Sequence, residues 1–183
     1  MERENIAVGL DIGTTKIVAM IGKKNEYGKL EILGIGKSKS LGVARGVVNN
    51  ITQTIQSIQQ AVNEAEENSG YKINDVVVGI AGQHIRSIQE FKIDGQTEIK
   101  EPIGMFGSRL EASFHVVVGQ AASIRNIGRC IQSSGIELSG LTLEPLASSD
   151  SVLSQEEKEA GVALIDIGGG TTDLAIFKDG IIR

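Results

Sequence analysis

Two stretches of the chain repeat one pattern of residue types that suits phosphate binding. In each, an apolar run leads into an aspartate, a glycine-containing turn and threonines, and a second apolar run follows. Glycine permits a tight turn whose backbone N–H groups approach an anion closely, and threonine hydroxyls add donors. We expect two hairpins that face each other and clamp a nucleoside triphosphate. The residues expected to bind it are Asp11, Gly13, Thr14, Thr15 and Lys16, with Asp166, Gly168, Gly169, Gly170, Thr171 and Thr172.

The charged residues of the two copies have different expected tasks. Phosphate would repel Asp11 and Asp166, so we expect them to hold Mg²⁺ through the waters that this slowly dehydrating ion keeps. Lys16 would neutralise phosphate charge, which is the kind of positioning and charge stabilisation that phosphoryl transfer needs. One copy alone could equally be an ordinary glycine turn. The presence of both favours a nucleoside triphosphate and Mg²⁺ as ligands.

Beyond these boxes, longer segments carry a family resemblance. The boxes themselves resemble the phosphate-1 and phosphate-2 motifs of the superfamily of actin, sugar kinases and heat-shock chaperone ATPases. Residues 75–85, 103–111, 143–149 and 161–173 together resemble FtsA, a family of actin-like bacterial cell division proteins, and the match runs nearly end to end. The resemblance implies an α/β fold with an actin-like (ribonuclease H-like) first domain, a partial small α+β subdomain and the first hairpin of a second actin-like domain.

The expected domain limits follow from the resemblance. They are 1–89 for the core of the first domain, 90–143 for the partial subdomain, 144–160 for an interdomain helix and 161–183 for the start of the second domain. FtsA-like chains have a longer stretch, including a helix, where this chain passes directly from Gln89 to Glu90. The chain also stops before the residues that hold adenosine in the family. We therefore expect a fragment that binds ATP weakly or undetectably.

The resemblance also implies a function for the whole protein. It would bind ATP as a switch ligand, hydrolyse it slowly at most, assemble into actin-like filaments, and link tubulin-like FtsZ and other division proteins to the inner face of the cytoplasmic membrane. Membrane attachment would use a C-terminal helix beyond this chain. By resemblance Glu144 orients the attacking water, although it could equally serve only to favour a helix N-terminus. The alternatives are a PilM-like pilus-assembly scaffold and a kinase of the sugar-kinase branch.

Composition excludes some classes of function. A net charge of −5 and a pI near 5.1 argue against nucleic-acid binding, which needs clustered Lys and Arg. We interpret the lysines at positions 23, 24, 29, 37 and 39 as solvated strand and loop ends. The lone Cys130 falls in a helical apolar pattern, which predicts a buried thiol and is consistent with a reducing cytoplasm.

The apolar periodicity predicts alternating strands and helices. We expect a helix that begins after Asn49 or Asn50 and ends at Gly70. A second helix, 121–134, would join strands 90–94, 110–119 and 136–143 in a small α+β unit, and the pattern turns helical again over 144–159. The hairpin 162–177 would be marginal alone, so its edges should seek a partner. The other strands are expected at 6–10, 17–21, 30–38 and 76–81.

Overall fold

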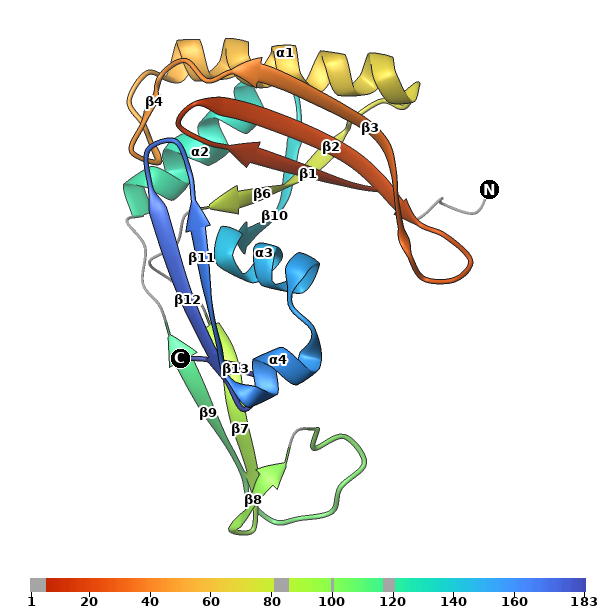
Figure 1. Ribbon diagram of the computed structural model, residues 1–183, viewed down its shortest axis with the longest axis vertical. Helices are drawn as coiled ribbons and strands as arrows, with labels where there is room; N and C mark the ends of the chain where they lie inside the picture. The colour runs from red at the N-terminus through yellow and green to blue at the C-terminus, as the bar shows by residue number, and fades with distance from the viewer. Residues whose placement is uncertain (1–5, 81–85, 100, 117–120) are drawn as a thin grey trace.

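The computed structural model describes residues 6–80, 86–99, 101–116 and 121–183 (Figure 1). Its largest unit is a five-stranded sheet in the order β10-β6-β1-β2-β3. β1, β2 and β3 are antiparallel neighbours, whereas β6 runs parallel to β1 and β10 runs parallel to β6. The strand bounds are Ile6–Ile12 (β1), Lys16–Lys24 (β2), Leu30–Lys39 (β3), Asp75–Ile80 (β6) and Glu137–Leu143 (β10).

Two helices, α1 (Ile51–Ser69) and α2 (Ala121–Ser133), cover one face of this sheet (Figure 1). The predicted limits of α1 are confirmed: the side chain of Asn50 accepts a hydrogen bond from the Gln53 amide at 3.0 Å, and Gly70 ends the helix in the left-handed conformation at φ 75°. α1 lies directly on β3, because a Cβ atom added to Gly36 would overlap the helix backbone at Ala61.

Aliphatic side chains fill the layer between these helices and the sheet. The predicted burial of Cys130 is confirmed, and burial raises the pKa of its thiol. The layer fixes where β1 ends and β2 begins, and so where the first phosphate-type turn lies. Its fully buried members include Leu10, Ile17, Ile21, Ile58, Val76, Val78 and Ile131.

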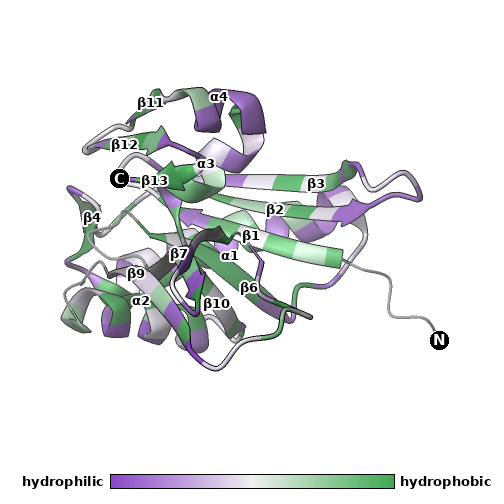
Figure 2. Ribbon diagram, turned by 90° about the horizontal axis from the view of Figure 1, so that it is seen from below, coloured by the Kyte–Doolittle hydropathy of each residue, from purple (hydrophilic) through white to green (hydrophobic). Residues whose placement is uncertain are grey.

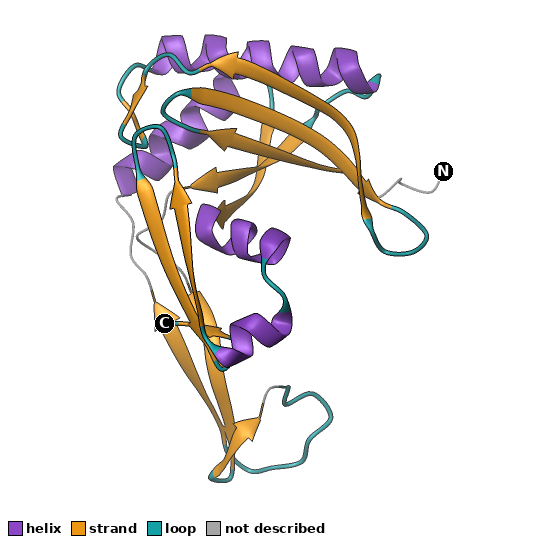
Figure 3. Ribbon diagram, in the orientation of Figure 1, coloured by secondary structure: helices purple, strands orange, loops and turns teal. Residues whose placement is uncertain are grey.

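A small three-stranded sheet, in the order β8-β7-β9, extends away from the main sheet (Figure 3). Its strands are β7 (Arg86–Ile93), β8 (Gln96–Ile99) and β9 (Leu110–Val116). β7 runs through the Gln89–Glu90 junction with a shift of register between Ile88 and Glu90. Residues 117–119 of the predicted strand 110–119, and Ala81 of the predicted strand 76–81, lie outside the described residues.

The strand predicted at 136–143 does not belong to this small unit, and that prediction is wrong. The strand is β10 of the main sheet, and α2 packs with α1 rather than on the small sheet. Alternating residue types indicate a strand but do not indicate its partner. Here the partner is the parallel strand β6, more than fifty residues earlier in the chain.

The third sheet contains β11 (Val162–Ile167), β12 (Thr172–Lys178) and β13 (Ile181–Ile182). The helical segment predicted at 144–159 is two helices, α3 (Glu144–Val152) and α4 (Gln155–Ala160), because Leu153 is extended and Ser154 begins a new capping box. α4 is mainly hydrophilic, whereas the strand β12 that it contacts carries apolar residues (Figure 2).

The sequence predicted that the hairpin β11–β12 would be isolated and marginal, but in the structure other elements pack against it. The third strand β13 extends it, and both α3 and α4 pack against it. Ala175 and Phe177 are buried on the side of the helices, whereas Ile165 and Leu174 stay exposed on the other side. No helix within the described ranges is long and apolar enough to cross a membrane.

Candidate phosphate- and metal-binding cleft

The two glycine turns have the same local geometry. The amide of Gly13 donates to the carbonyl of Lys16 at 3.1 Å, and the amide of Gly168 donates to the carbonyl of Thr171 at 2.9 Å. A Cβ atom at either glycine would lie 3.0–3.1 Å from that same carbonyl oxygen, which explains why each turn has glycine there. In both copies the aspartate lies two residues before the glycine. The repeated sequence is thus a repeated structure.

The two turns touch each other at their tips (Figure 1). A Cβ atom at Gly169 would overlap the side chain of Thr15, and one at Gly170 would lie 2.7 Å from Thr14 Oγ1. Segments more than 150 residues apart in the chain are therefore held together, and only glycine fits at these two positions of the second turn.

A short hairpin fixes the first turn from the side. It comprises β4 (Val43–Ala44) and β5 (Val47–Val48), and its Gly46 amide donates to Thr14 Oγ1 at 3.1 Å. The Thr14 hydroxyl accepts this bond and keeps its own hydrogen for a ligand. The Ser40 amide likewise donates to the Thr15 carbonyl at 3.1 Å.

Behind the tips lies a cleft of about 660 Å³. It is bounded by the face of the main sheet that α1 and α2 leave uncovered, by α3, and by the second turn. Of the predicted site residues, it is lined by Asp11, Gly13, Thr14, Thr15, Lys16, Glu144, Asp166, Gly168, Gly169 and Thr171.

Two predicted residues lie elsewhere. Gly170 packs against Thr14 at the tip of the turn, outside the set that lines the cleft. Thr172 begins β12 and is exposed, on the same side of the strand as Leu174. Successive side chains of a strand point to opposite faces, so Thr172 faces away from α3 while its neighbour Asp173 faces toward it.

Acidic side chains gather at the cleft and perturb one another. Burial raises the pKa of Asp11, an effect that Lys16 opposes and Asp166 adds to. Burial raises the pKa of Glu144 to about 7, with further contributions from Asp11, Asp173 and Asp166. Burial and Asp166 also raise the pKa of Asp173. The carboxylates thus share one electrostatic environment, although they come from four separate elements or turns.

Two residues of this environment were missed as site residues by the sequence reasoning. Asp173 pairs directly with Asp166 across the β11–β12 ladder. Ser148 Oγ donates to Asp166 Oδ2 at 3.0 Å. Both had a signal in the sequence: the hairpin pairing places the two aspartates opposite each other, and Ser148 follows Glu144 by four residues on one helix, which places them on one face.

Glu144 is positioned by two strands as well as by its own helix. It begins α3 immediately after β10, and its Cγ lies 3.2 Å from where a Cβ atom of Gly79 on β6 would be. The glycine leaves room for the glutamate side chain beside the sheet. Glu144 also lies in the first turn of α3, where an acidic residue is favourable, so both expected roles are compatible with this position.

The donor set at the cleft suits a hard cation. In the part of the chain that the structure describes, no three or more His, Cys, Asp or Glu side chains form a cage that could hold a metal directly. Asp11 and Asp166 both line the cleft and offer carboxylate oxygens, the ligands that Mg²⁺ takes while keeping several waters. The residues therefore fit an ion held through water rather than a fully protein-ligated one.

Solved structures show the same fold at low sequence identity. The ethanolamine utilization protein EutJ from Carboxydothermus hydrogenoformans matches with a TM-score of 0.62 and 21% identity, over 97% of this chain and 49% of that one. A PilM–PilN type IV pilus biogenesis complex matches with a TM-score of 0.71 and 14% identity, over 97% of this chain and 59% of that one. The chain thus shares its mixed α/β fold with these two proteins, over about half the length of each.

Proteins with related sequences identify the family more specifically than the shared fold does. The family model described as an SHS2 domain inserted in FTSA matches residues 43–118. Cell division protein FtsA of Pseudomonas aeruginosa is 42% identical over 96% of this chain and 52% of its own length, and that of Neisseria meningitidis is 38% identical over 95% and 52%. FtsA of Escherichia coli K12 is 30% identical over 97% and 52%.

The matched region of these relatives is longer than the chain itself. The alignment with the Pseudomonas protein has 217 positions, against 183 residues here, so the relative contains residues that this chain lacks. The chain spans about half the length of the curated relatives it matches. From the two turns, the fold and these identities together, the chain belongs to the FtsA family of cell division proteins.

Proposed function

We propose that this chain supplies the phosphate- and Mg²⁺-binding part of an actin-like, ATP-binding cell division protein. The main sheet with α1 and α2 would be the core of the first actin-like domain, the β8-β7-β9 sheet part of its small subdomain, and the β11–β12 hairpin the start of the second domain. The observation that carries the proposal is the contact of two glycine turns, which share one hydrogen-bond pattern, at the rim of one carboxylate-lined cleft.

The residues of the two turns would bind the phosphates directly. The hydroxyls of Thr14, Thr15 and Thr171 and the turn amides donate hydrogen bonds, and Lys16 supplies positive charge. Asp11 and Asp166 would hold Mg²⁺ through its waters, and Ser148 fixes one oxygen of Asp166. When bound, the ion neutralises phosphate charge, which reduces the repulsion between the ligand and these carboxylates.

Glu144 would orient water beside the terminal phosphate. Its carboxyl group is half-buried and has a pKa of about 7, so near neutral pH it exchanges a proton readily. The nucleotide would act mainly as a switch ligand that favours the closed arrangement of two domains, with hydrolysis slow. The bound nucleotide would thus change the conformation of the protein, and its phosphate would not be transferred to a substrate.

For the whole protein we propose assembly into actin-like filaments that link tubulin-like FtsZ polymers to the inner face of the cytoplasmic membrane at the division site. Other division proteins would be further partners, and attachment would use a C-terminal helix outside this chain. The support is the identity of the relatives, which are FtsA proteins. These sequence identities favour this function over a sugar kinase, and over a pilus-assembly scaffold, which only a shared fold supports.

Nucleotide binding can be tested on the chain by NMR titration with ATP and Mg²⁺ into the millimolar range. We expect weak binding, with shifts concentrated at Thr14, Thr15 and Gly168, and its loss in Asp11→Asn and Lys16→Gln. Glu67→Gln, an exposed site on α1, is the control. Shifts spread over the surface, or unchanged binding in both variants, would overturn the proposed site. Co-sedimentation with FtsZ tests the partner separately.

A further inference from the structure

Three lysines from two neighbouring strands lie beside the first phosphate turn. Lys16 begins β2 and Lys39 ends β3, and the two are directly opposite each other in the antiparallel ladder. Lys37 pairs with Val18 one step further along the same face. Opposite residues have Cβ atoms about 5 Å apart and diagonal neighbours about 7–8 Å apart, so the three ammonium groups can converge on one ligand.

The face to which Lys37 and Lys39 belong follows from the residue between them. Ser38 is buried, and its hydroxyl donates to the Ser57 carbonyl of α1 at 2.6 Å. Because side chains alternate along a strand, Lys37 and Lys39 must emerge on the other face, away from α1. Lys37 and Lys16 indeed line the cleft, and Lys39 is exposed next to Thr15, whose carbonyl bonds to the following residue.

Close contacts with acids do not neutralise the charges of these lysines, although Lys16 lies near enough to Asp11 to oppose the rise in the pKa of that carboxyl. Within the described ranges, no ion pair joins Lys16, Lys37 or Lys39 to a carboxylate. Lys16 and Lys39 lie directly opposite each other on neighbouring strands. Like charges in this arrangement are destabilising. The acids of the cleft gather instead around Asp11 and α3. The cleft therefore has a cationic wall and an anionic wall, whereas a solvated surface of mixed charge would intersperse them.

We propose that Lys37 and Lys39 join Lys16 in an anion-binding wall that contacts the phosphate chain of a nucleoside triphosphate. The proposal rests on the proposed function of the cleft and assigns two further binding residues to it. The wall attracts the ligand in proportion to its charge, so it favours a triphosphate over a diphosphate. Lys37 and Lys39 are then ligand-binding residues rather than the solvated strand ends that their sequence positions indicated.

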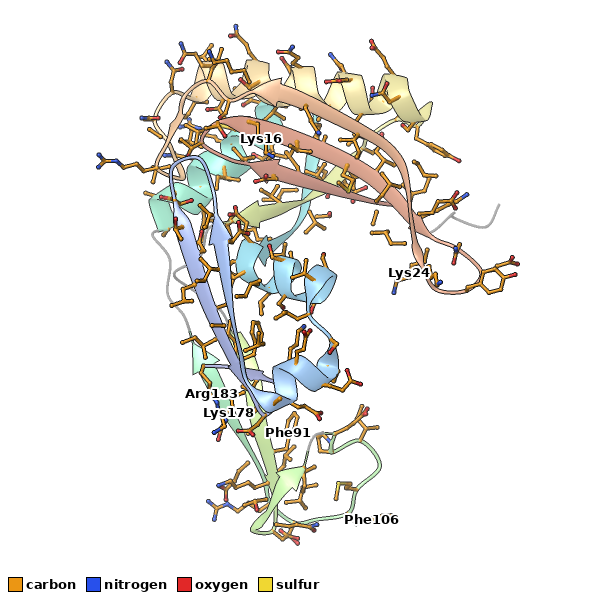
Figure 4. The ribbon with its side chains drawn as sticks, viewed as in Figure 1. Lys16, Lys24, Phe91, Phe106, Lys178 and Arg183 are labelled. Atoms are coloured by element: carbon orange, nitrogen blue, oxygen red, sulfur yellow. The ribbon has the colours of Figure 1, made fainter. Side chains whose placement is uncertain are left out.

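The matched control lies on β2, the strand of the same sheet that pairs with β3. Lys23 and Lys24 are at the far end of β2, opposite Glu31 and Leu30 of β3, and Figure 4 shows Lys24 at the end of the strand remote from Lys16. The variants Lys37→Gln/Lys39→Gln and Lys23→Gln/Lys24→Gln remove the same charge from the same sheet. They differ in distance from the cleft and in their cross-strand partners, since Lys23 lies opposite Glu31 and Lys39 opposite Lys16.

The chain is titrated with inorganic triphosphate and pyrophosphate, each with Mg²⁺, at low and at physiological ionic strength. At low ionic strength, Lys37→Gln/Lys39→Gln is expected to weaken triphosphate binding about tenfold and pyrophosphate binding about threefold. Both effects should be smaller at physiological ionic strength, because ions screen exposed charges. At physiological ionic strength the control pair is expected to change either affinity by less than about twofold, since its charges at the far end of β2 lie more than a Debye length away.

The outcomes separate this inference from the function on which it rests. If Lys16→Gln weakens binding but the Lys37/Lys39 pair does not, the wall is wrong and the proposed phosphate site stands. If neither Lys16→Gln nor Asp11→Asn alters binding, the proposed site itself fails. An equal loss in the Lys37/Lys39 pair and in the control pair means attraction by net charge only, and it overturns the wall.

Discussion

Replacing Glu144 by glutamine tests whether the carboxylates of the cleft repel one another. In the folded chain, burial and then Asp11, Asp173 and Asp166 raise the pKa of Glu144 from 4.5 to about 7. Between these two values an unfolded chain has released the proton that the folded chain still holds. Stability therefore falls as pH rises through this window and stays reduced above it, because the folded state then carries the unfavourable charge.

The size of the effect follows from the shift. One pKa unit corresponds to about 1.4 kcal/mol, so a shift of this size has an upper bound of about 3 kcal/mol. Glu144 is only half-buried and solvent screens part of the repulsion, which reduces the expected cost to roughly 2 kcal/mol. Glutamine keeps the shape of the side chain and never ionises. Glu144→Gln should thus be about 2 kcal/mol more stable than the parent above pH 8, and nearly equal to it below pH 4.5.

Urea unfolding followed by circular dichroism, repeated over this pH range, measures the difference. Glu67→Gln is the control, because Glu67 is exposed on α1 and far from the cleft. Mg²⁺ should stabilise the parent more than Glu144→Gln at high pH, since a cation at Asp11 and Asp166 offsets the charge that the variant lacks. A stability difference that does not grow with pH would refute the electrostatic reasoning.

The remaining predictions concern packing, capping and the contact between the turns. Gly36→Ala should lose about 3 kcal/mol in urea unfolding, because its methyl group meets the backbone of α1. Gly9→Ala on β1 of the same sheet meets nothing within 4 Å and should change stability by less than about 0.5 kcal/mol. Ser154→Ala should cost about 1 kcal/mol through loss of the capping box, measured the same way. Gly169→Ala should separate the turns and shift the amide resonances of both, and adding Thr15→Ala should partly restore them; unchanged spectra in the single variant would contradict the contact.

The elements predicted well from sequence are those specified by local residues. Asn50 and Gly70 delimit α1 by satisfying its terminal backbone groups, and such signals act within a few residues. The break at Leu153 was not predicted, although it is encoded locally: Ser154 and Glu157 have the spacing of a capping box that starts a new helix. The membership of β10 in the main sheet was not encoded locally. It depends on pairing with β6, a contact that no short segment specifies.

The candidate site likewise has features that local residues determine and features that depend on contacts between distant segments. The residue types of the two turns indicated phosphate binding. The geometry of each turn is determined by its own residues, chiefly its first glycine. What sequence reasoning lacked was the pairing that brings Asp173 and Ser148 beside Asp166, which needs both the β11–β12 register and the packing of α3. Thr172 was included as part of a motif, although alternation along β12 turns it away from the cleft.

The opposed charges of the cleft give the strongest physical argument for a ligand. Glu144 and Asp173 gain no compensating ion pair among the described residues, while Lys16 and Lys39 face each other across a strand pair. Each arrangement costs stability by itself, and a fold without a binding task would gain by interleaving the two signs. A metal-bound polyphosphate would offset both costs together, because the acids would hold its cation and the lysines its phosphates. The pH dependence of the stability of Glu144→Gln therefore tests the acidic side of the cleft. The salt dependence of polyphosphate binding by Lys37→Gln/Lys39→Gln tests the basic side.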